Sequence, residues 1–300
     1  GGVVALVFLR RERRQRLVDF DLRGTVFIFV GLVALLVAMN RIPHWGITSP
    51  ALLGLIAGGV ALVAAFIWRE RRVPRPVLDL ALLRRPALAI PTLILALQVT
   101  GHQTAMVVLP FFLVRALGLS ATAAGTLFVV GAASMFAGGV AGGQLSDRLG
   151  PRTVFRATMV MVAVGALALT ALDETSPLIQ VAVPLAVMGG AGGMLQATAS
   201  SAQLNAVPSH QIGMGSALFT AVINFSGALG ATLGGILMTA GQTSALAALD
   251  QGAAVVAAAY LRVATAATLI LAGGLVVTLM QPGLQADRRG ETETNEVRSG

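Results

Sequence analysis

The sequence predicts an all-α integral membrane protein. Of its 300 residues, 56% are hydrophobic and only 11% are charged, and the mean hydropathy is +0.82. Soluble domains carry about 25% charged residues, so this composition suits a surface that faces lipid. Eight apolar runs are long enough to cross a bilayer, which takes about 20 helical residues. Because polar and apolar residues do not alternate at a period of two, helices are favoured over a β-barrel.

The apolar runs follow one another through almost the whole chain. Residues 1–9 are apolar but too short to cross, so we expect them to be the end of a span whose beginning is missing. Residues 281–300 are polar and mixed in charge, which is typical of a disordered tail. The eight predicted spans are Gly24–Asn40, Ala51–Trp68, Ala87–Val114, Ala121–Leu145, Thr153–Leu172, Pro177–Asn205, Ile212–Ala240 and Val255–Met280.

The basic residues, all 21 of them arginine, predict the orientation of these spans. Eighteen lie in alternate connectors, within residues 10–23, 69–86, 148–156 and 288–298, whereas three lie on the other side. Arginine is enriched in cytoplasmic loops, so the first set and the C-terminus are expected in the cytoplasm. The connector 206–211 should also be cytoplasmic, yet it holds no arginine. The net charge of +8 therefore indicates membrane orientation and no nucleic-acid partner, since few aromatic residues accompany the arginines.

The sequence offers little for enzyme chemistry. It has no cysteine, so disulfides, thiolate chemistry and cysteine metal ligands are excluded. No metal-spaced His, Asp and Glu cluster, phosphate-binding glycine loop or nucleophile–base set is evident. We therefore expect no enzyme activity, no metal and no cofactor.

A compact charged segment, GGQLSDRLGPR at residues 142–152, lies between the fourth and fifth predicted spans. We expect a cytoplasmic turn in which Asp147 faces the positive end of a helix and Arg148 and Arg152 pair with carboxylates or helix C-termini. A tight loop that merely follows the arginine bias explains the same charges. Glycines allow close backbone contacts and turn angles here, at Gly142, Gly143 and Gly150.

The segment closely resembles the G-x-L-[AS]-D-R-x-G-x-R signature of the major facilitator superfamily. In that superfamily the signature joins the second and third helices of each six-helix half. Pro151 occupies a position that is often basic in fuller versions. The resemblance implies a conformational gate that helps lock the cytoplasmic side in one alternating-access state. Its residues would be Gly143, Asp147, Arg148, Gly150 and Arg152.

The resemblance extends over essentially the whole chain. It makes residues 87–280 the C-terminal six-helix half and residues 24–68 two extra central spans, which distinguish the fourteen-span drug:proton antiporters from twelve-span relatives. VDFDLRG, WGITSP and PVLDLALLRRPALA are also similar to that branch. Residues 10–23 and 69–86 then become cytoplasmic connectors, and residues 1–9 end the sixth span. On this interpretation the N-terminal half, which transport requires, is missing.

Polar residues within spans are costly and therefore mark candidate functional positions. Facing a common cavity, they would contact a greasy or cationic cargo while the rest of the wall stays apolar. Hydrogen bonding between helices is the alternative, above all for Ser and Thr. Three sets share a helix face: Gln98 with His102; Gln196 with Ser200 and Gln203; and Ser216 with Thr220 and Asn224.

Small residues and prolines in the spans predict how the helices pack. Glycines four residues apart let two helices approach closely, and they recur in five pairs. Proline within a span predicts a kink, at Pro91, Pro110 and Pro184. The glycine pairs are Gly54 with Gly58, Gly138 with Gly142, Gly139 with Gly143, Gly189 with Gly193, and Gly230 with Gly234.

The leading hypothesis is a proton-coupled exporter of drugs or other amphipathic or cationic small molecules in a bacterial cytoplasmic membrane. A carrier for a metabolite or siderophore and a truncated, non-transporting membrane protein are the alternatives. Protons are the expected coupling ion. Because no carboxylate lies mid-span, we expect the proton-carrying carboxylate in the missing spans and His102 at the cargo site.

Topology is tested with single cysteines in this cysteine-free chain. Arg75→Cys and Arg156→Cys should be shielded from an impermeant thiol reagent in intact cells, and Thr175→Cys should react. All three should react once the cells are permeabilised. Labelling of Arg75→Cys or Arg156→Cys in intact cells would contradict the span count.

Overall fold

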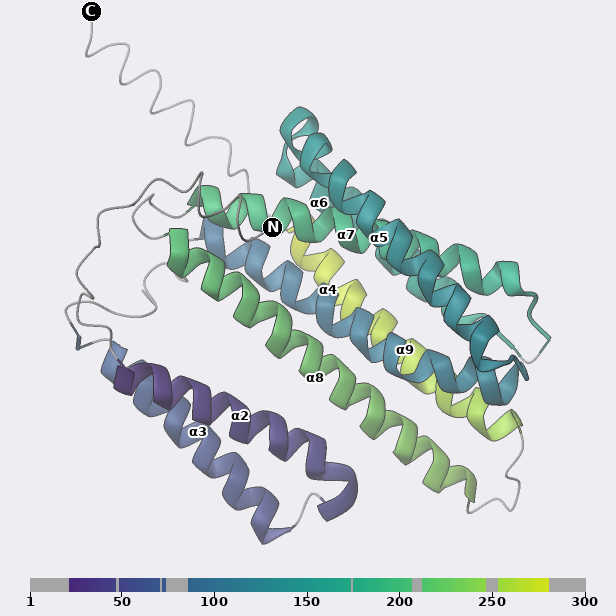
Figure 1. Ribbon diagram of the computed structural model, residues 1–300, viewed down its shortest axis with the longest axis horizontal. Helices are drawn as coiled ribbons and strands as arrows, with labels where there is room; N and C mark the ends of the chain where they lie inside the picture. Colours follow the sequence, from purple (N-terminus) through teal and green to yellow (C-terminus); the bar gives the residue numbers. More distant parts are fainter. Residues whose placement is uncertain are drawn as a thin grey trace, which may run out of the picture.

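The computed structural model describes residues 22–46, 49–70, 72–73, 86–173, 175–206, 212–246 and 253–280. These residues are almost entirely helical and contain no strand, which confirms the all-α class (Figure 1). The expected span end at 1–9, the tail at 281–300, and most of the connectors at 10–23 and 69–86 lie outside the described residues. The helices are α2 (Leu22–Trp45), α3 (Pro50–Glu70), α4 (Pro86–Phe111), α5 (Ala121–Leu149), α6 (Pro151–Thr170), α7 (Leu178–Ala206), α8 (Ile212–Leu246) and α9 (Ala253–Leu279).

Seven of the described helices are long and apolar enough to cross a membrane, one fewer than the eight predicted spans. The eighth, α2, is a helix of 24 residues, of which the apolar stretch Arg23–Met39 is described in full. At 1.5 Å per residue, 24 residues are about 36 Å long, enough for the roughly 30 Å hydrocarbon core.

Helices α4 to α9 form one bundle, and α2 and α3 form a hairpin beside it. α4 packs on α7, α8 and α9, and α7 also packs on α5 and α6. In the most apolar stretch of α4, 61% of the residues are buried, whereas in those of α3 and α5 the share is 17% each. Figure 1 shows the α2–α3 hairpin alongside α8, with which α2 is in contact. α4 is therefore the central helix.

The bundle is filled by two apolar clusters. In the larger, the rings of Phe112 and Tyr260 stack with centroids 4.2 Å apart. In the smaller, Phe155 and Met159 of α6 pack with Leu195 of α7 and with residues of α4. Burial of such side chains fills the space between helices at interior density.

Glycines bring the backbones of α5 and α7 into direct contact. A Cβ on Gly138 would collide with the carbonyl oxygen of Gly190, and one on Gly142 would collide with the backbone of Met194. The contact is reciprocal, because a Cβ on Gly189 or on Gly193 would meet carbonyl oxygens of α5. Two predicted glycine pairs, Gly138 with Gly142 in α5 and Gly189 with Gly193 in α7, are therefore confirmed as sites of close helix approach.

The contact between α4 and α8 combines glycine with hydroxyl groups. A Cβ on Gly230 would collide with the carbonyl oxygen of Thr100, and one on Gly234 would meet that of Thr104. The Thr104 hydroxyl lies 3.1 Å from the Gly230 carbonyl oxygen, to which it can donate across the interface. This glycine pair too is confirmed as a packing contact.

Two other predicted glycine pairs do not mediate close packing among the described residues. Cβ atoms added to Gly54, Gly58 or Gly143 would meet nothing within 4 Å, and one on Gly139 would meet only Gly193 at 3.9 Å. The prediction was wrong at these positions because spacing identifies a small-residue face but not the helix that it meets.

A π-helical turn, η2 (Phe112–Ala116), follows α4 directly. Pro110, two residues before it, has no N–H to donate, and the Leu117 N–H donates to the Phe112 carbonyl at 3.1 Å. Pro91 and Pro184 lie inside α4 and α7, which continue through them. The distortion is thus local to Pro110.

The α5–α7 contact is tested by Gly138→Ala. The added Cβ forces the two backbones apart, so we expect the free energy of unfolding to fall by about 1–3 kcal/mol, the usual cost of overpacking. The measurement is the thermal unfolding midpoint in detergent.

The matched control is Gly139→Ala, on the next residue, where a Cβ has ordinary contact distance. It should leave the midpoint unchanged. Equal destabilisation by both variants would show that helix flexibility, and not the α5–α7 contact, sets their stability.

Candidate functional site

The charged segment at 142–152 is not the compact turn that we predicted. Helix α5 continues through it to Leu149, and α6 begins at Pro151. Gly150 alone connects them, with φ +80°, and its N–H donates to the Ser146 carbonyl at 3.0 Å. Glycine after a helix and proline at the first position of the next are the residues that such a junction favours.

The ionic groups of this segment do not stabilise α5 alike. Asp147 lies exposed in the last turn, where the negative end of the helix dipole disfavours a carboxylate, whereas Arg148 beside it is favoured. Arg152 is half-buried in the first turn of α6. Gly143 is not needed for packing, since a Cβ there meets nothing. Neither Asp147 nor Gly143 is thus explained by the stability of the described helices.

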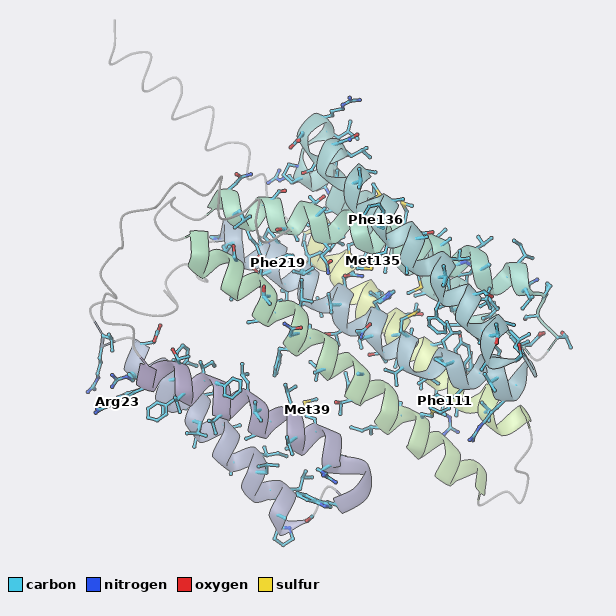
Figure 2. All side chains as sticks on the ribbon, in the orientation of Figure 1. Arg23, Met39, Phe111, Met135, Phe136 and Phe219 are labelled. Carbon is cyan, nitrogen blue, oxygen red and sulfur yellow. The ribbon has the colours of Figure 1, made fainter. Side chains whose placement is uncertain are left out.

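A cavity of about 380 Å³ lies between α4, α5, α7 and α8. Figure 2 shows that Met135 of α5 lies on the side toward α4, while its neighbour Phe136, 78% exposed, points away. The cavity is lined by Gln98, Val99, His102 and Gln103 of α4, Met135 of α5, Met188, Gly189, Gly192 and Gln196 of α7, and Ile223, Asn224, Gly227 and Ala228 of α8.

Four of the predicted cargo-site residues meet in this cavity. Gln98 and His102 lie one turn apart on α4, opposite Gln196 of α7 and Asn224 of α8. Gln98 is only 3% exposed, and its amide nitrogen lies near Gly192, at 3.1 Å from where a Cβ would be. The Nδ1 atom of His102 is enclosed and has no hydrogen-bond partner among the described residues.

The other four predicted residues, Ser200, Gln203, Ser216 and Thr220, lie outside the cavity lining. Gln203 is fully buried and donates its amide N–H to the Thr92 hydroxyl at 2.9 Å, which joins α7 to α4. Ser200 is half-buried on α7. Thr220 is exposed on α8, and its hydroxyl donates to the Ser216 carbonyl at 3.0 Å. Helix–helix hydrogen bonding, the alternative considered from the sequence, thus describes Gln203.

Sequence reasoning missed several of the lining residues. Gln103 was not singled out, because it does not share the i, i+4 spacing of Gln98 and His102; its polar side chain within a span is the signal that could have found it. Met135 and Met188 carry no polar signal. Gly227 admits Gln103, whose Cγ lies 3.8 Å from the position of an added Cβ.

The described residues also contain a second hollow, of about 340 Å³, at the opposite end of α6 from Gly150. It is lined by Leu172, Asp173 and Thr175 together with residues of α9. The Asp173 carboxylate accepts hydrogen bonds from the Thr175 hydroxyl and N–H and from the Ser176 hydroxyl. These bonds lower the pKa of Asp173. The carboxylate of Asp173 therefore accepts hydrogen bonds within the connector between α6 and α7, which favour its charged form.

No group of three or more His, Cys, Asp or Glu side chains with metal-binding geometry occurs in the part of the chain that the structure describes. The cavity between α4, α5, α7 and α8 is therefore the candidate site, and its polar groups are amides and one imidazole.

Comparison of the sequence with known protein families finds a match over the helices that form this cavity. The sequence profile of the Major Facilitator Superfamily matches residues 91–277, which contain the cavity and the segment 142–152.

Three curated bacterial relatives illustrate the match. The multidrug transporter protein MdtP of Bacillus subtilis is 28% identical over 247 residues, covering 80% of this chain and 45% of its own length. The lincomycin resistance protein LmrB of Listeria monocytogenes is 26% identical, covering 66% and 42%. The multidrug resistance protein B homolog of Mycobacterium tuberculosis is 26% identical, covering 79% and 45%. The chain spans less than half the length of each.

Proposed function

Because the chain belongs to the Major Facilitator Superfamily, we propose that it is part of a carrier that exports drugs or other amphipathic small molecules across a bacterial cell membrane. The cavity between α4, α5, α7 and α8 carries the proposal. It places a few hydrogen-bonding groups in an otherwise apolar wall, which is the usual make-up of a small-molecule site. The names of the relatives, which include multidrug transport and resistance, support this choice of cargo.

We assign the segment 142–152 to the conformational gate. Asp147 is exposed at the end of α5 in a position that its own helix disfavours, so its role is assigned to contacts made in another state of the carrier. The one-residue junction at Gly150 couples α5 directly to α6. The arginine-rich connectors support placing this end, and the C-terminus, in the cytoplasm.

Proton coupling is the proposed source of energy. The described acidic residues, Glu70, Asp147 and Asp173, lie at or near helix ends and do not line the cavity. A proton carrier needs a titratable group reached alternately from each side. We therefore place the proton-carrying carboxylate outside the described residues and give His102 a role in cargo binding.

The proposal is tested by drug-driven proton release and drug accumulation in inverted membrane vesicles that contain the full-length protein. Accumulation that depends on the proton gradient is the expected result. Vesicles with abundant folded protein that accumulate none of a broad drug panel would contradict export.

The cargo role of His102 predicts the outcome of His102→Gln in these vesicles. The relative export rates of different drugs should change by about fivefold for those that hydrogen-bond the imidazole, since one such bond is worth roughly 1 kcal/mol. Drug-induced proton release should persist for the drugs still exported. Thr220→Ala, which alters α8 outside the cavity, is the control and should leave the drug profile unchanged. Loss of proton release with drug binding preserved would show that His102 carries the proton.

The gate assignment predicts that Asp147→Asn lowers export at normal membrane abundance. A charge-assisted hydrogen bond contributes about 1.5–3 kcal/mol, so a fall of roughly tenfold or more is expected if it stabilises one access state. Arg156→Gln removes an exposed charge from α6 outside the signature and should retain export. Unchanged export in Asp147→Asn would identify the segment as an ordinary cytoplasmic connector.

A further inference from the structure

The imidazole of His102 is a polar group in the cavity wall with a buried nitrogen that the described residues leave without a hydrogen bond. Its Nδ1 atom is enclosed and has no partner among the described residues. The neighbouring threonines of α4 differ, because Thr92 donates to the Leu88 carbonyl at 2.6 Å and Thr104 donates to that of Thr100 at 2.8 Å. Buried polar atoms are normally hydrogen-bonded, and the ring of this unpartnered histidine lines the cavity, so a molecule in the cavity is placed to bond the imidazole.

The charge of the lining narrows the choice of that partner. Its other polar side chains are the neutral amides of Gln98, Gln103, Gln196 and Asn224. Proteins hold organic cations with carboxylates or with aromatic faces, and the described part of the chain contributes neither kind of side chain to the lining. Moving a permanent cation out of water into this wall is therefore not compensated.

The apolar part of the lining suits a greasy molecule of irregular shape. Met135 and Met188 contribute flexible, polarisable thioethers, and Ile223 and Val99 contribute branched aliphatic surface. Gly189, Gly192 and Gly227 leave room beside them. The wall thus offers apolar contact over most of its area and hydrogen bonds at a few points.

We propose that this cavity selects uncharged amphipathic molecules that carry a hydroxyl or amide group, with His102 as the side chain that recognises that group. A neutral imidazole has one donor and one acceptor nitrogen, and a hydroxyl serves either of them. The proposal rests on the export function proposed above and names the part of the cargo range that these helices select.

The test uses three probes of similar shape. Triphenylmethanol is neutral and carries a hydroxyl, triphenylmethane is neutral and lacks one, and tetraphenylphosphonium is a permanent cation. Equilibrium binding of each is measured to the full-length protein in lipid nanodiscs. We expect triphenylmethanol to bind about tenfold more tightly than triphenylmethane, as one buried hydrogen bond allows. Tetraphenylphosphonium should not displace triphenylmethanol from this site.

Substitutions assign the preference to His102. His102→Leu should abolish the difference between triphenylmethanol and triphenylmethane, and His102→Gln should reduce it, because the amide places its donor and acceptor at other positions than the imidazole does. Met135→Leu is the matched control at the same cavity, and it should shift the affinities of both neutral probes together. Each variant must keep the wild-type elution profile and thermal midpoint.

Two results would overturn the proposal. One is a preference for triphenylmethanol that survives in His102→Leu, and the other is displacement of triphenylmethanol by tetraphenylphosphonium with equal or higher affinity. Export is measured separately in the inverted vesicles. A His102-dependent preference without any drug export would refute the proposed function while the selectivity stands, and export without that preference would refute the selectivity alone.

Discussion

Lipid offers no hydrogen bonds to a backbone, and this constraint determines the rest of the structure. Every described apolar segment is helical because a helix satisfies its own N–H and C=O groups. Lipid also gives helices little hydrophobic reason to associate, so close packing and local hydrogen bonds hold them together. The contacts of α5 with α7 and of α4 with α8 are of this kind, with glycine against carbonyl oxygen at each. The cavity lies where these two helix pairs face each other.

Hydropathy and arginine placement were sufficient to predict the fold class, because both report directly on the surrounding lipid and water. Glycine spacing predicted close packing for Gly138, Gly142 and Gly189 but also for Gly54 and Gly58, where the structure shows none. A sequence shows which face of a helix is small, whereas the neighbour of that face is set by the whole bundle.

The candidate site was predicted in part, for a related reason. Gln98, His102, Gln196 and Asn224 were singled out by the cost of polar groups in lipid, and they meet at one cavity. Gln203 carried the same signal, yet it bonds Thr92, because the signal does not distinguish a ligand contact from an interhelical hydrogen bond. The apolar lining residues gave no signal at all. For the charged segment 142–152, the sequence likewise predicted which residues carry charge but not their secondary structure, which is the end of α5 with a one-residue junction to α6.

The close contact between the backbones of α5 and α7 limits how these two helices can move relative to each other. Each of four glycines, Gly138, Gly142, Gly189 and Gly193, faces an atom of the opposite backbone, so a slide of one residue, about 1.5 Å, would bring a side chain to a position that has no room for it. Rotation of either helix has the same effect. The two helices therefore form one rigid pair. Asp147 lies near one end of this pair, and Met188, Gly192 and Gln196 line the cavity along its length, so the same rigid pair joins the charged segment to the cavity.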